Sequence, residues 1–372
     1  MNLKYQATLF KDSVLQNELF QKIANKIGYH LGMPNTISIK DIYTLSKEQN
    51  QINNLNNSCL FSLIENPFNQ SGKLPPSMTS LEERKVLSYL AEKYYQGQGE
   101  IIDLGSGIGG TVYPLALGLH NNKLVSSKHQ RIHAYDIFTP LDKSITARGS
   151  TLYFSQKNSN NKVKFSFKND SYLDIFVENC QNYSDYIKIN DSDITLLTWN
   201  KKPIEIIHID IAKTIHIWKH LVGEFFDSLI PGKSIIIHQD FKRVRLPWLI
   251  YSMGFILPYV QLIDPVINGT LYCRLIKPLP QKLIDYLKLD DFSIEQKIQS
   301  IIDMTTAMKE MKFYGSVNYE LMQNLKDLAI AYVYFYAGEQ KQAILQLEKQ
   351  KSNKYLVWRF PEFFQEIEKV SS

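Results

Sequence analysis

Between residues 80 and 278 the chain alternates between two hydrophobic patterns. Densely apolar runs of strand length are separated by segments with apolar residues at helical spacing, as after 110 and from 211 to 230. Strands that alternate with helices form a mainly parallel sheet covered by helices on its faces. We therefore predict an α/β, doubly wound, Rossmann-like sheet with strands at 100–104, 131–138, 163–167, 204–210 and 234–239.

The sheet is expected to end in a hairpin. Two further strand candidates, 259–263 and 270–276, are joined through Asn268-Gly269, a dipeptide typical of two-residue hairpin turns. This predicts an antiparallel last strand. The mixed pattern between 171 and 203 predicts a helix up to Cys180, and the apolar fragments at 186–189 and 194–197 do not fix a conformation.

Flanking regions of different character surround this sheet. Residues 1–79 carry one helical pattern and then polar, Asn-rich sequence, which predicts an accessory region. The sheet domain, 80–280, begins at a capping box formed by Ser80 and Glu83. Residues 281–372 predict an all-α extension, with helices at 294–311, 319–337 and 339–349, through which the chain could form a homo-oligomer.

Composition excludes several classes of protein. The hydrophobic share of 44% and charged share of 21% are those of an ordinary globular protein. The 42 basic residues are dispersed among 37 acidic ones, which gives no strong nucleic-acid signal. No apolar run approaches the ~18 residues that a membrane span needs. The first residues lack the pattern of a secretory signal peptide. The three cysteines belong to no motif. We expect a cytoplasmic protein without a membrane span.

A glycine-rich turn is the strongest local motif. The strand ending in Asp103 and Leu104 runs into Gly105, Ser106, Gly107 and Gly109 and then into a helix. Glycines at such a turn let the backbone bend sharply and approach a ligand with no Cβ in the way. The motif, with Asp103 two residues before its first glycine, predicts a nucleoside-binding loop in which Asp103 is among the cofactor contacts. A dinucleotide enzyme would also use the glycines.

Two acidic residues are candidates for contacts with the nucleoside. Asp136 ends the second predicted strand, where a carboxylate can accept hydrogen bonds from both ribose hydroxyls; the alternative is an aspartate that caps the next turn. Its spacing from Gly105 exceeds the ~20 residues typical of dinucleotide folds. Asp170 follows the predicted strand at 163–167 and could contact the adenine amino group, or it could cap the next helix.

Carboxylates also follow two neighbouring strands farther along the chain. Asp210 ends one strand, and Gln239 and Asp240 end the next. Because parallel strands place their carboxyl ends at one edge of the sheet, these side chains should lie close together. Carboxylate and amide oxygens suit a hard cation such as Mg²⁺, so we predict a metal site there. Pairing of the acids with Lys213, Lys242 or Arg243 is the alternative.

From about Ser80 to Pro278 the chain resembles the class I methyltransferases, and within them the metal-dependent O-methyltransferases of the catechol and macrolide-sugar types. The segment from Asp210 to Phe241 is also similar to a poorly characterised bacterial branch of that superfamily. The resemblance implies S-adenosyl-L-methionine as cofactor, Asp210 and Asp240 as metal ligands, and Lys213 as the base for an acceptor hydroxyl. Gln239 replaces an acid and removes one negative charge.

The sequence as a whole predicts methyl transfer to a sugar or small-molecule hydroxyl, with Lys213 as the general base or as the group that positions the acceptor. The competing role for Lys213 is that of a solvated residue at the start of the helix or of an ion-pair partner for Asp210. A non-catalytic protein that binds adenosylmethionine and uses its helical extension for assembly is the rival function. A nicotinamide enzyme is a third alternative, but Tyr153 and Lys157 lie in a polar connection that does not suit a catalytic pair.

Overall fold

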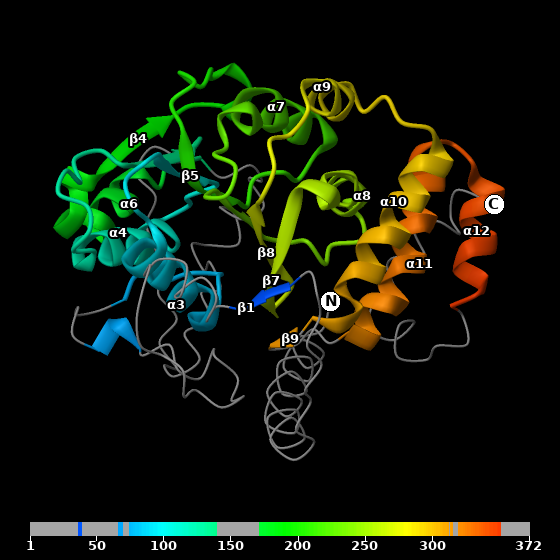
Figure 1. Ribbon diagram of the computed structural model, residues 1–372, viewed down its shortest axis with the longest axis horizontal. Helices are drawn as coiled ribbons and strands as arrows, with labels where there is room; N and C mark the ends of the chain where they lie inside the picture. The colour runs from blue at the N-terminus through cyan, green and yellow to red at the C-terminus, as the bar shows by residue number, and fades with distance from the viewer. Residues whose placement is uncertain are drawn as a thin grey trace, which may run out of the picture.

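The computed structural model describes residues 36–38, 66–69, 74–139, 171–311, 313–314 and 319–350 (Figure 1). A nine-stranded sheet runs through this part of the chain in the order β1-β7-β8-β6-β5-β2-β3-β4, with β9 beside β7. All neighbours are parallel except those of β8. The strands are β1 (Thr36–Ser38), β2 (Glu100–Leu104), β3 (Ile132–Asp136), β4 (Ile187–Asp191), β5 (Ile204–Ile209), β6 (Ile235–His238), β7 (Val260–Ile267), β8 (Thr270–Leu275) and β9 (Phe313–Tyr314).

Helices cover both faces of the sheet, because alternate strand residues are apolar on each side. Ile101, Ile206 and Ile237 face a core shared with α3, α4 and α6, whereas Ile102 and Ile207 face a core shared with α7 and α8. The helices are α3 (Leu81–Tyr89), α4 (Val112–Asn121), α6 (Leu173–Cys180), α7 (Ile215–Phe225), α8 (Pro247–Ile256), α9 (Gln281–Leu289), α10 (Ile294–Ala307), α11 (Tyr319–Tyr336) and α12 (Gln340–Glu348).

Shorter helical turns link these elements. A π-helical turn, η3 (Leu90–Tyr94), continues α3 directly. The 3-10 turns are η2 (Pro67–Asn69), η4 (Gln181–Tyr186), η5 (Ile194–Leu196), η6 (Phe226–Ser228), η7 (Leu257–Tyr259) and η8 (Met308–Glu310). No helix in the described ranges has the length and apolar character that crossing a bilayer requires.

The strand order confirms the predicted fold class. After β2 the chain adds β3 and β4 on one side, then returns to build β5, β6 and the β7–β8 hairpin on the other. The two halves separate at the carboxyl ends of β2 and β5, which is where ligands bind in open α/β sheets. This is a Rossmann-like methyltransferase fold with an antiparallel last strand.

The predicted capping box and the predicted hairpin turn are both present in the structure. Ser80 and Glu83 form the capping box of α3, with Glu83 N–H donating to Ser80 Oγ at 3.2 Å. Asn268 and Gly269 take φ angles of 50° and 95° in the hairpin turn. Asn268 Nδ2 donates to Ser80 Oγ at 2.6 Å, so the hairpin is fastened to the start of α3.

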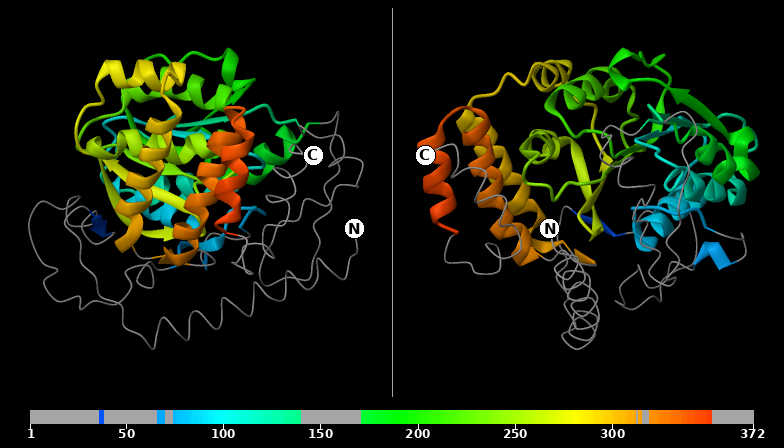
Figure 2. Two further views of the ribbon diagram at one scale, coloured as in Figure 1. Left: turned by 90° about the vertical axis from the view of Figure 1, so that its right-hand side faces the viewer. Right: turned by 180° about the vertical axis from the view of Figure 1, so that it is seen from behind.

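Of the C-terminal helices, α10 and α11 pack on α8, α9 packs on α7, and α12 packs on α11 (Figure 2). Ser300 Oγ on α10 donates to the Tyr251 carbonyl at 2.6 Å, and Tyr336 Oη on α11 donates to the Arg245 carbonyl at 3.0 Å. The extension thus shares a core with the sheet domain and contacts the loop between β6 and α8. The three-part division of the chain stays a prediction.

Four elements differ from the sequence predictions, and one of them is β1, which pairs with β7 although no strand was expected before residue 80. The strand beside β3 is Ile187–Asp191, a segment whose conformation the pattern left open, whereas the predicted strand at 163–167 lies outside the described residues. Strand pattern was not expected after residue 280, but Phe313–Tyr314 pairs with β7. Helix α9 was not predicted either, and the helical pattern in residues 9–27 lies outside the described residues.

Candidate functional site at the carboxyl edge of the sheet

The glycine-rich loop between β2 and α4 has the backbone conformation that its sequence predicts. Gly105, Gly107 and Gly109 take φ angles of 96°, 52° and 91°, in the left-handed region that favours glycine. A Cβ on Gly105 would lie 3.1 Å from the Asp210 carbonyl carbon, and one on Gly109 would lie 2.6 Å from Cys180 Sγ. A Cβ on Gly107 would meet no described atom within 4 Å. The described residues therefore leave the space beside Gly107 open, as a ligand-binding loop requires.

Asp136 lies directly beside this loop. Its Oδ2 accepts the Gly107 N–H at 2.9 Å, and its Oδ1 accepts the Phe138 N–H at 2.8 Å and the Tyr172 hydroxyl at 2.7 Å. Burial, and then the Asp136 charge, raise the pKa of Tyr172, which stays a neutral donor. The structure thus brings Asp136 to the predicted position, with a tyrosine hydroxyl on one of its oxygens.

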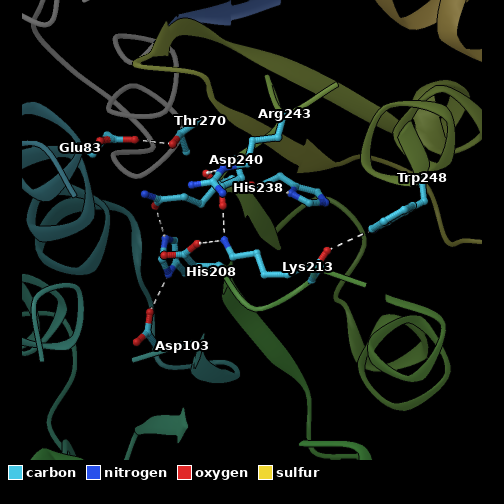
Figure 3. A network of polar contacts seen from close by, with 12 residues as sticks. Glu83, Asp103, His208, Lys213, His238, Asp240, Arg243, Trp248 and Thr270 are labelled. Carbon is cyan, nitrogen blue, oxygen red and sulfur yellow. Dashed lines mark hydrogen bonds and ion pairs between the residues drawn. The ribbon is translucent and has the colours of Figure 1, made fainter. Parts of the chain in front are cut away.

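Asp103 lies beneath the loop and is fully buried. Its Oδ1 is 2.6 Å from His208 Nδ1, and its Oδ2 accepts the Thr111 hydroxyl at 3.0 Å (Figure 3). Direct contact with a cofactor, as predicted from sequence, does not match this placement. Asp103 instead supports the loop from below by joining β2 to the start of α4 and to β5.

His208 connects Asp103 to the end of the next strand. The imidazole is buried, and its Nε2 lies 3.0 Å from Gln239 Oε1 (Figure 3). Burial by itself would lower the pKa of His208, but the hydrogen bond and charge of Asp103, with Asp210, raise it above the usual value. A protonated imidazole donates to both partners, which fits two oxygen acceptors. His208 is therefore a satisfied interior histidine.

Asp210 and Asp240 converge as predicted, but a lysine lies between them. Lys213 Nζ is 2.5 Å from Asp210 Oδ1 and also contacts Asp240 Oδ2, while Arg243 Nε is 2.7 Å from Asp240 Oδ1 (Figure 3). Burial and the Asp240 charge raise the pKa of Asp210, although Lys213 opposes them. Lys213 and Arg243 lower the pKa of Asp240 despite its burial. The ion pair with Asp210 is the alternative that the sequence left open.

The predicted magnesium site does not match this arrangement. The Lys213 ammonium lies where a cation shared by Asp210 and Asp240 would bind, and the Gln239 amide oxygen faces His208. In the described part of the chain, no group of three or more His, Cys, Asp or Glu side chains converges as a metal site. The residues present do not fit a divalent cation.

The aromatic residues near this edge serve packing. Trp218 is fully buried, and Trp248 Nε1 donates to the Ala212 carbonyl at 3.1 Å, which fastens the turn after β5 to α8. Asp170 lies outside the described residues, so its predicted adenine contact is not placed.

Sequence reasoning missed residues that the fold brings to the loop. Tyr172 precedes α6 and reaches Asp136, Asn179 on α6 donates to the Ile108 carbonyl at 2.8 Å, and Thr111 donates to Asp103. Thr111 had a signal, since it follows the glycine motif at the first turn of the helix. Tyr172 and Asn179 had none, because α6 is separated in sequence from the loop.

Comparisons with known proteins add little to this picture. No protein-family model and no curated protein matches the sequence. Among solved structures, the crystal structure of a "putative RNA methyltransferase" from Pyrococcus horikoshii aligns with 64% of this chain and 98% of its own, at 12% identity and a TM-score of 0.32. Because that score is low, the class rests on the strand order: a protein with a Rossmann-like methyltransferase fold.

Proposed function

We propose that the protein is an S-adenosylmethionine-dependent methyltransferase whose acceptor is a hydroxyl of a sugar or small molecule. The observation that carries the proposal is the pairing of the glycine-rich loop with Asp136. The Gly107 N–H donates to the Asp136 carboxylate. A Cβ placed on Gly107 would have no described atom within 4 Å. A nucleoside presents two ribose hydroxyls, which suit a carboxylate at this place.

The residues present fit the cofactor's nucleoside. The backbone of Gly105, Ser106 and Gly107 would approach its methionine and ribose parts, and Asp136 would accept the ribose hydroxyls. The Tyr172 hydroxyl on Asp136 Oδ1 then yields to a ribose hydroxyl or shares that oxygen with it. Bound adenosylmethionine supplies a sulfonium methyl group for displacement by a nucleophile. The chain's part is to orient the acceptor in line with that methyl, which proximity and alignment accelerate strongly.

Asp210 is the best-placed proton acceptor for a hydroxyl substrate. It follows β5 directly, and its backbone touches the loop at Gly105. A carboxylate whose pKa is raised by burial is a stronger base than an exposed one. Lys213 is engaged by two carboxylates, so we assign it to positioning in place of the base role suggested by sequence.

The test of the function is a turnover assay. The purified protein is incubated with adenosylmethionine and pools of hydroxylated acceptors, and S-adenosylhomocysteine is quantified. Product that depends on an acceptor and falls ~100-fold or more in Asp210→Asn, the typical loss of a general base, supports the proposal. Tight cofactor binding with no product from any pool would favour the rival function, an adenosylmethionine-binding assembly protein.

A further inference from the structure

The charged groups at the carboxyl edge form a closed array. Lys213 bridges Asp210 and Asp240, and Arg243 takes the second oxygen of Asp240 (Figure 3). Asp240 itself has a left-handed backbone, with a φ of 58°, in the turn whose Arg243 N–H donates to its carbonyl at 2.8 Å. The turn therefore holds one carboxylate between two cations.

A buried pair of polar side chains lies next to this array. Asp103 and His208 are buried and 2.6 Å apart. Two carboxylates, Asp210 and Asp240, thus face two cationic side chains, Lys213 and Arg243, beside the buried Asp103–His208 pair. The charges of this array therefore balance from its own residues, and a divalent ion bound beside Lys213 would add two uncompensated positive charges.

The backbone explains how Lys213 reaches this place. A tight turn follows β5, closed by a hydrogen bond of 2.7 Å from Lys213 N–H to the Ile211 carbonyl. The turn directs the flexible lysine stem back over the strand ends, where both carboxylates meet its ammonium group. Ala212, within the turn, is held by Trp248 on α8.

We infer that the Lys213 ammonium is the resident cation of this site, in the position that the sequence pattern assigned to magnesium. An ammonium group has three donors. Asp210 and Asp240 take two of them, and the third can donate to the oxygen of an acceptor. The site thereby orients a hydroxyl substrate without a bound divalent ion. The identity of the cation does not depend on the proposed function, whereas the contact with an acceptor hydroxyl rests on it.

Manganese titration followed by electron paramagnetic resonance tests the inference directly, because the signal of free Mn²⁺ disappears on binding. The wild-type protein is expected to leave that signal unchanged. Lys213→Met removes the charge but keeps the stem, and it should create a two-carboxylate site with a Kd of about 0.1–1 mM, the range of weak cation sites. Adding Asp240→Asn to Lys213→Met should abolish the gained binding.

Lys201→Met is the matched control, since it removes an exposed lysine that pairs with Asp227 at 3.2 Å away from the site. It should behave like the wild type. Saturable Mn²⁺ binding by the wild type that Asp210→Asn removes would overturn the inference, as would a folded Lys213→Met protein that binds no Mn²⁺. If circular dichroism shows that Lys213→Met does not fold, the wild-type and Asp210→Asn titrations decide alone.

Discussion

His238 provides a sharp test of the packing beneath the site. Its ring is fully buried at the end of β6, with its centroid 5.2 Å from that of Trp218 and 6.0 Å from that of Phe241. Nδ1 lies 3.2 Å from the Gln239 carbonyl, and Nε2 has no hydrogen-bond partner among the described residues. Burial lowers the pKa of His238 to about 4.

The energetic consequence follows from linkage between proton binding and folding. In the unfolded chain this histidine binds a proton below a pH of about 6.5, whereas in the folded protein it stays neutral until about pH 4. Acid therefore favours the unfolded state. Since one pKa unit corresponds to ~1.4 kcal/mol, His238 should remove about 3 kcal/mol of stability between pH 7 and pH 4.

The pKa of His208 is shifted in the opposite direction, so its effect on stability has the opposite dependence on pH. Its pKa is raised in the folded protein, so the stability that it contributes is present at low pH and is lost as pH rises through its folded-state pKa. The wild-type profile alone would mix the two effects. The difference between the wild type and His238→Phe isolates one histidine, because Phe keeps the ring packing and cannot be protonated.

The assay is urea unfolding at several pH values from 7 to 4, followed by tryptophan fluorescence. Relative to the wild type, His238→Phe should gain about 3 kcal/mol of unfolding free energy as pH falls over that range. His216→Phe, which removes an exposed histidine of α7, is the control and should run parallel to the wild type. A constant difference between His238→Phe and wild type at every pH would refute the reasoning.

Three further predictions concern the loop and the edge. Gly109→Ala should lower the free energy of unfolding by ~2 kcal/mol or more, measured by urea titration, because its Cβ would overlap Cys180 at a positive φ. Gly107→Ala should lower the free energy of unfolding by only about 1 kcal/mol, because alanine is strained at this left-handed φ. It should nevertheless weaken adenosylmethionine binding in calorimetry, since the new Cβ enters the open space beside the loop. An affinity equal to that of the wild type would place the ligand elsewhere. Exhaustive chelation with EDTA should leave turnover unchanged because Lys213 serves as the cation, and a loss restored by Mg²⁺ would contradict this.

The sheet was largely predictable because its central strands are apolar on both faces. All residues of Glu100–Leu104 are buried, so this run can be recognised as a strand without knowing which strands pair with it. The strand Ile187–Asp191 escaped because only its first residue is buried, so it lacks a hydrophobic run. The pairing of Phe313–Tyr314 with β7 involves two residues and leaves no periodic pattern.

The site was predictable in its positions but not in its side-chain directions. Strand ends placed Asp210 and Asp240 together, yet nothing in the spacing shows that Lys213 turns back between them. The pairing of Asp103 with His208 depends on the register of β2 and β5, in which these two residues are direct neighbours. That register joins distant parts of the chain and is set by the packing of the whole sheet.

Isothermal titration of the wild-type protein with adenosylmethionine tests the central claim most directly. The account predicts saturable binding, no comparable binding of a nicotinamide dinucleotide, and a loss of about 1 to 3 kcal/mol in Asp136→Ala, the cost of stranding charged hydrogen-bond partners. Circular dichroism of the Asp136→Ala protein is the control that shows whether the variant is folded. Tight nicotinamide dinucleotide binding with no heat from adenosylmethionine would contradict the account.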